Sequence, residues 1–173
     1  MIVSRTSALA AVAAVVLPAV ASCAARSQSA GTVRPWPCRI VVERPLLQVV
    51  EDAWEKSGSF RQQCGALAER RAVAALTPGR ARTGSLALTR ITTADDGVVV
   101  GRVEVPLGLD ALEYIAHELE HVLERAEGAD LPAQSASKDS GVWMALDGYE
   151  TQRAIDRGRQ VAREVRESSR AAR

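Results

Sequence analysis

The chain has 173 residues, of which 47% are apolar and 25% charged, and its formal net charge is +1. This length supports one domain with its own core, whereas two domains would each be too small. The nearly neutral charge excludes a partner held by a strongly basic surface, so we expect no binding to nucleic acid.

Residues 1–23 have the three-part layout of an export signal. Arg5 precedes an apolar run over residues 8–20, and the small residues Ala21 and Ser22 follow it. A membrane-spanning helix needs about 20 apolar residues, and this shorter run is interrupted by Pro18. We therefore expect an exported bacterial protein rather than one with a permanent membrane span.

The end of the apolar run resembles the lipobox of bacterial lipoproteins, in which the cysteine becomes the acylated first residue. The matching residues are Val20, Ala21, Ser22 and Cys23. This predicts a lipid anchor at Cys23 in the cell envelope. The alternative is ordinary cleavage after Ala21, which would give a secreted or periplasmic soluble protein.

The cysteine count favours lipidation. There are three cysteines, and an odd thiol is a liability in an oxidising compartment. If Cys23 is acylated, Cys38 and Cys64 remain as a pair whose disulfide would stabilise the domain by about 3 kcal/mol. The alternative for Cys64 is a buried thiol.

The predicted domain occupies residues 38–168. It follows a tether at 24–37, which is rich in Ser, Ala, Gly and Pro, and precedes a basic tail at 169–173. Hydrophobic spacing predicts, in chain order, a strand at 39–43, a helix at 46–56, a helix at 60–69 and a short strand at 72–76. The last of these could instead continue the preceding helix, and Thr77-Pro78-Gly79 is expected to end it.

Alternating residues at 85–92 and 98–105, around an Asp-Gly turn, predict a β-hairpin. A helix is then expected at 110–127, because Asp110 and Glu113 resemble a capping box and Gly128 is a typical stop. After a polar loop at 129–141, a last helix is predicted from about Met144, with Leu146 and Tyr149 among its buried residues.

The strongest motif is His117-Glu118-Leu119-Glu120-His121, an HExxH sequence inside the predicted helix at 110–127. Histidines four residues apart share one helix face and can reach one ion, while Glu118 points to a neighbouring sector as a general base. These are the only two histidines in the chain. The alternative is a solvated, charged helix face on which the histidines lie beside Glu113, Glu120 and Glu124.

A catalytic zinc needs a third protein ligand, which here cannot be histidine. This excludes the metzincins, and Cys64 is a poor candidate because an exported thiol is usually paired or buried. Asp147 and Glu150, predicted on the last helix, are the carboxylates to consider, and either could face the metal. Glu150 could instead pair with a nearby arginine on the same helix.

The motif and the order of elements resemble the gluzincin clan of zinc peptidases, and the length is similar to that of the single-domain minigluzincins. The resemblance covers most of residues 39–166 and implies an α+β, zincin-like fold with Glu150 as the third ligand. The family often has an acidic residue four positions after that glutamate, where this chain has Ala154. A hydrogen-bond partner that orients the first histidine must therefore come from elsewhere in the chain.

The implied activity is peptide-bond hydrolysis by a zinc-activated water, with Glu118 as general base. Tyr114 or Tyr149 could stabilise the oxyanion, and a peptide or protein substrate could add to an edge of the hairpin. The alternative function is a non-catalytic lipoprotein whose zinc serves structure or partner binding. A structural site would have no use for the carboxylate of Glu118.

Overall fold

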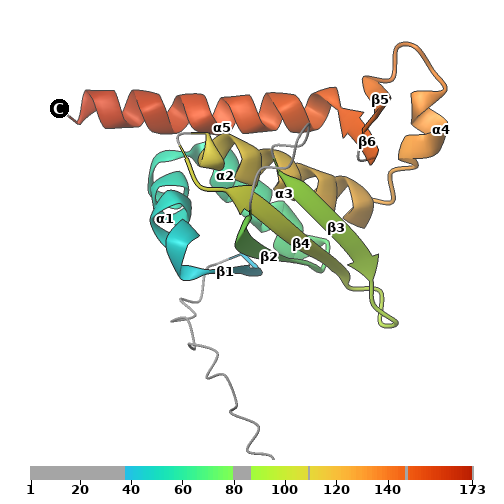
Figure 1. Cartoon of the computed structure of the whole chain (residues 1–173), viewed down its shortest axis with the longest axis horizontal. Coiled ribbons are helices and arrows are strands. Elements are labelled where there is room, and N and C mark those ends of the chain that lie inside the picture. Colours follow the sequence, from blue (N-terminus) through green and yellow to red (C-terminus); the bar gives the residue numbers. More distant parts are fainter. Residues whose placement is uncertain (1–37, 80–86, 109, 147, 173) are drawn as a thin grey trace, which may run out of the picture.

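A four-stranded sheet forms one layer of the computed structural model (Figure 1), which describes residues 38–79, 87–108, 110–146 and 148–172. The predicted export signal, Cys23 and the predicted tether lie outside these residues. The strands, in spatial order, are β1 (Ile40–Val42), β2 (Ala72–Gly79), β4 (Val99–Pro106) and β3 (Leu88–Thr93). The first three are parallel, and β3 runs antiparallel to β4. The expectation of an α+β fold is thus confirmed as a mixed sheet combined with helices.

Helices cover one face of the sheet. They are α1 (Leu47–Lys56), which follows the short 3-10 helix η1 (Arg44–Leu46), α2 (Gly58–Glu69) and α3 (Ala111–Ala126). The alternating pattern along β4 explains this, because Val99, Val103 and Val105 are buried on the helix side while Arg102 is exposed on the other. The long helix α5 (Gln152–Ala171) crosses outside this layer, packs mainly on α3 and also contacts α1 and α2 (Figure 1).

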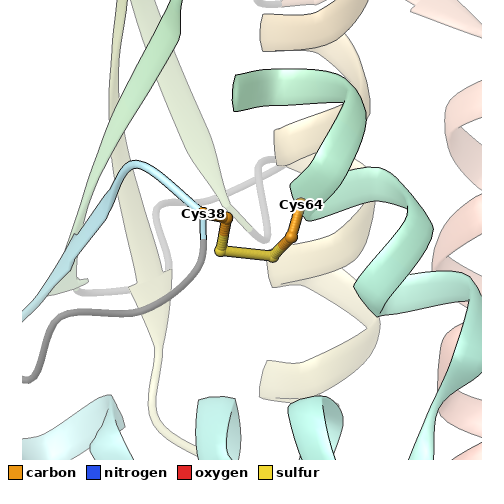
Figure 2. The surroundings of a disulfide bond; sticks show 2 residues. All are labelled: Cys38 and Cys64. Atoms are coloured by element: carbon orange, nitrogen blue, oxygen red, sulfur yellow. A yellow bond between two sulfur atoms is a disulfide. The ribbon is translucent and has the colours of Figure 1, made fainter. Parts of the chain in front are cut away.

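The predicted pairing of Cys38 with Cys64 is confirmed. The disulfide joins the residues just before β1 to α2, and both cysteines are buried (Figure 2). It therefore fixes the first strand to the helix layer.

Most predicted elements are present, including the β3–β4 hairpin, but three expectations near them were wrong. The strand β2 continues through Pro78. A proline is tolerated there because β1 pairs with β2 only as far as Leu76, and no other described strand lies on that side. The side chain of Asp110 does not cap α3. The predicted polar loop contains a short helix, α4 (Leu131–Ser135), whose first turn is capped by Asp130.

The start of the last helix was also predicted wrongly. The region around Met144 forms two paired antiparallel strands, β5 (Val142–Ala145) and β6 (Gly148–Thr151). The helix α5 begins only at Gln152. Gly148 has φ +147°, which is incompatible with a helix running through it. Leu146, expected in the core, lies at the hairpin end and is 87% exposed.

The contact between α3 and β4 depends on Gly101. A Cβ atom at this position would lie 2.4 Å from Cγ2 of Val122, so only glycine allows the helix to approach the strand this closely. Since α3 carries the HExxH motif, this contact sets the height of the motif above the sheet.

Replacing Gly101 with Ala is expected to lower the free energy of unfolding by about 1–3 kcal/mol, because the added methyl overpacks the interface. Adding Val122→Ala should recover part of this loss, so the double variant should lose less than the sum of the single variants. Gly65→Ala is the control: it is exposed in α2 with nothing within 4 Å of the added Cβ, and it should stabilise by about 0.5–1 kcal/mol. Chemical denaturation measures the free energy of unfolding of the three single variants and the double variant. An unchanged free energy of unfolding in Gly101→Ala would contradict the packing argument.

Glu164 attaches the second half of α5 to the start of α2. Its carboxylate accepts hydrogen bonds from Ser57 Oγ at 2.6 Å, Ser59 N at 3.0 Å and Ser59 Oγ at 2.5 Å. Burial alone raises the pKa of Glu164, but these hydrogen bonds outweigh it and lower the pKa to about 2. The ionised carboxylate therefore stabilises the fold.

This lowered pKa predicts a specific pH dependence. Because the folded pKa lies below the ordinary value, the stabilisation is fully present above about pH 4.5 and is lost as the pH falls towards 2. The difference in unfolding free energy between the wild type and Glu164→Gln should therefore shrink across this range. Glu167→Gln, at an exposed position on the same helix, should show no such change. A constant difference for Glu164→Gln would contradict the role of its charge.

Candidate metal centre

The two histidines of the HExxH motif meet Glu150 where α3 lies beside β6. Both histidines lie on α3, with their Nε2 atoms 3.2 Å apart. Glu150 lies on β6, and its two carboxylate oxygens are each 3.3 Å from one of these nitrogens. One ligand atom from each residue lies within 4.8 Å of the others, so the group could hold a metal ion.

The spacing of these atoms fits a bound ion. In a tetrahedral site with metal–ligand bonds of about 2.0–2.1 Å, neighbouring ligand atoms are about 3.3 Å apart. The separations of 3.2 and 3.3 Å agree with this value. Two imidazoles and one carboxylate also leave a fourth position open.

The charges around the histidines favour a cation. Burial lowers the pKa of His121, but hydrogen bonds to the carboxylates of Glu124 and Glu150 outweigh it and raise the pKa to about 10. Burial likewise raises the pKa of Glu150, and the hydrogen bonds to His117 and His121 lower it well below its ordinary value. A proton therefore balances these carboxylates in the metal-free protein, and a metal ion can take its place.

His121 has a second carboxylate partner. Its Nδ1 lies 2.9 Å from Oε2 of Glu124, which is only 3% exposed, while Oε1 of Glu124 accepts a 2.7 Å hydrogen bond from the hydroxyl of Thr151. The sequence interpretation placed Glu124 only on a charged helix face and did not identify it as a partner of His121. Its position three residues after His121, on the same helix face, was the available signal.

The second carboxylate inside the motif has a separate role. Glu120 is fully buried and interacts with Gln63 Nε2 at 2.5 Å, Arg153 Nε at 2.7 Å and Arg157 Nε at 3.3 Å. These contacts join α3 to α2 and α5. The alternative of a solvated charged face is therefore wrong for Glu120 and Glu124, which are buried. The alternative pairing of Glu150 with an arginine is also wrong, because Glu150 faces the histidines while Arg153 and Arg157 pair with Glu120.

The predicted site residues can now be placed. His117, His121 and Glu150 come together, but Glu150 is on β6 and not on a helix, because the hairpin replaces the first turns predicted for α5. Asp147, the alternative ligand, lies outside the described residues. Glu118 lines the same cleft as the three ligands without belonging to the group.

This cleft has a volume of about 950 Å³ and opens beside the histidines. The edge strand β3, α3, α4, the β5–β6 hairpin and α5 all contribute to its walls. Apart from the ligand group, most of the lining is apolar or aromatic. The larger of these side chains include those of Leu88, Ile91, Tyr114, Leu131, Tyr149 and Ile155.

The chain matches no protein-family model, no curated protein and no solved structure. The function must therefore be argued from the geometry of the site.

The purified chain is expected to bind about one metal ion, because one compact ligand group is present in the described part of the chain. At a free metal concentration of about 100 times the dissociation constant, binding should stabilise the fold by about 2.7 kcal/mol. Metal analysis and thermal unfolding with and without a chelator measure both effects. His117→Ala and His121→Ala should abolish them, and metal binding that persists in both variants would place the ion elsewhere.

Proposed function

We propose that the protein is a zinc-dependent peptidase with a zincin-like site, in which His117, His121 and Glu150 hold the ion. Two imidazoles, one carboxylate and an open position are the ligand set of several catalytic zinc sites. The observation that carries the proposal is the position of Glu118. It is one residue from a ligand and lines the cleft, yet it is not a member of the ligand group.

When bound, zinc would polarise a peptide carbonyl and lower the pKa of a water molecule towards neutrality. Glu118 acts as the general base that takes a proton from the attacking water and returns it to the leaving amine. Either Tyr114 or Tyr149 could donate a hydrogen bond from its phenol to the developing oxyanion. Both tyrosines line the cleft.

A polypeptide substrate suits the walls of the cleft. In the described part of the chain, β3 is the outer strand of the sheet and pairs only with β4. Its residues Leu88, Thr89 and Ile91 contribute to the lining. An extended peptide could therefore add to this edge through backbone hydrogen bonds, with its side chains against the apolar lining.

A non-catalytic zinc protein remains the alternative function, and Glu118 separates the two. A structural zinc site fills all four positions with protein ligands. A three-ligand group with a carboxylate beside it favours the peptidase.

For the location of the protein we retain the proposal of export and anchoring through a lipidated Cys23. None of the helices in the described residues has the length and hydrophobicity of a membrane-spanning segment. The proposal rests on the sequence of residues 1–23.

Glu118→Gln should retain zinc and lose peptidase activity by about 10²- to 10⁴-fold, because the general base is removed without removing a ligand. Glu150→Gln should instead weaken zinc binding, because it leaves only two strong ligands. Zinc affinity and peptide cleavage are measured for both variants.

Glu113→Gln is the matched control, since Glu113 lines the same cleft one helical turn before His117. It should retain both zinc and most of the activity. Asp147→Asn tests the alternative ligand. If Asp147→Asn loses zinc while Glu150→Gln keeps it, the ligand assignment is wrong, and full activity in Glu118→Gln would reject the proposed mechanism.

A further inference from the structure

We infer that Glu124 and Thr151 form a positioning pair that holds His121 and the segment bearing Glu150 in the arrangement needed for metal binding. Neither residue belongs to the ligand group. The inference rests on the metal centre of the proposed function and identifies the residues that orient its second histidine and its carboxylate ligand.

Glu124 controls the orientation of His121. The 2.9 Å contact between Nδ1 and Glu124 places the ring proton on Nδ1 when the imidazole is neutral. The lone pair of Nε2 is then directed towards Glu150 and His117, which lie 3.3 and 3.2 Å away. A ring flip would break the contact with a buried carboxylate, so one orientation is strongly favoured.

Thr151 extends this control to the third ligand. Its hydroxyl donates to Glu124 Oε1 at 2.7 Å and accepts from the backbone N of Ala154 at 3.0 Å, so it also caps the first turn of α5. The backbone N of Thr151 donates to Glu150 Oε1 at 2.8 Å. One residue thus connects the start of α5, the carboxylate that orients His121 and the carboxylate of Glu150.

Burial makes these contacts hard to replace. Thr151 is 2% exposed and Glu124 3% exposed, so water has little access to a donor or acceptor left without its partner. Removing either side chain should therefore change the relative position of His121 and Glu150, and this change appears as a lower metal affinity.

The test compares Thr151→Val with Thr151→Ser in the full chain. Valine keeps the shape but removes the hydroxyl, whereas serine restores it. Zinc affinity is measured by competition with a chromophoric chelator at a temperature where every variant is folded. Thr151→Val should bind zinc about 10- to 100-fold more weakly, and Thr151→Ser should recover most of the affinity. Glu124→Ala should resemble Thr151→Val.

Ser57→Ala is the matched control for the helix cap. Ser57 is also buried, and its hydroxyl caps α2 by accepting from Phe60 N at 3.0 Å, but it lies in the contact with Glu164. Ser57→Ala and Thr151→Val should both lower the thermal unfolding midpoint of the metal-free protein, and only Thr151→Val should lower zinc affinity.

Two results would overturn the inference. Wild-type affinity in folded Thr151→Val shows that the hydroxyl serves only as a cap, and it leaves the proposed function intact. Absence of zinc binding in the wild-type chain rejects both the positioning pair and the proposed function. If Glu124→Ala does not fold, the valine and serine variants at position 151 decide the question.

Discussion

The candidate metal centre depends on the close contact between α3 and α5. Two ligands lie on α3 and the third immediately before α5, so their separation is set by how these helices pack. Gly158 permits the contact: a Cβ atom there would lie 2.7 Å from the carbonyl oxygen of Glu113 and 3.2 Å from Cβ of His117. Any larger residue would push α5 away from the turn of α3 that carries the first histidine.

Buried carboxylates stabilise this contact on both sides of the motif. Glu120 is paired with arginines of α5, and Glu124 is bonded to His121 and to the cap of α5. A buried charge is costly unless it is paired, so each carboxylate strongly favours the packing that supplies its partners. The helix with the motif therefore has apolar contacts to the sheet, such as Val122 on Gly101, and polar contacts to α5. These contacts to the sheet and to α5 hold α3 in place, while its two histidines line the cleft.

The sequence predicted the elements whose signals are local. Alternation around Asp96-Gly97 predicted the hairpin, helical spacing predicted α1, α2 and α3, and the parity of the cysteines predicted the disulfide between Cys38 and Cys64. The HExxH spacing also identified two residues of the metal-binding group. The family resemblance then singled out Glu150, which could not be distinguished from Asp147 by spacing alone.

The errors come from features that hydrophobic spacing does not specify. Glu150 was expected on a helix, because helical spacing continues through residues that pair as β5 and β6. Glu124 was assigned only to a charged helix face, although its place three residues after His121 is a local signal. Its hydrogen bond from Thr151 could not be predicted, because it depends on where α5 begins. The proposed peptidase activity and the lipid anchor remain predictions.

A crystal structure of the zinc-loaded chain, with anomalous scattering at the zinc edge, is the most direct test of the central claim. The account predicts one ion bound by Nε2 of His117, Nε2 of His121 and the carboxylate of Glu150, with Glu118 facing the open position without ligating the ion. An ion bound at another position, or a site in which Glu118 replaces Glu150 as a ligand, would contradict it.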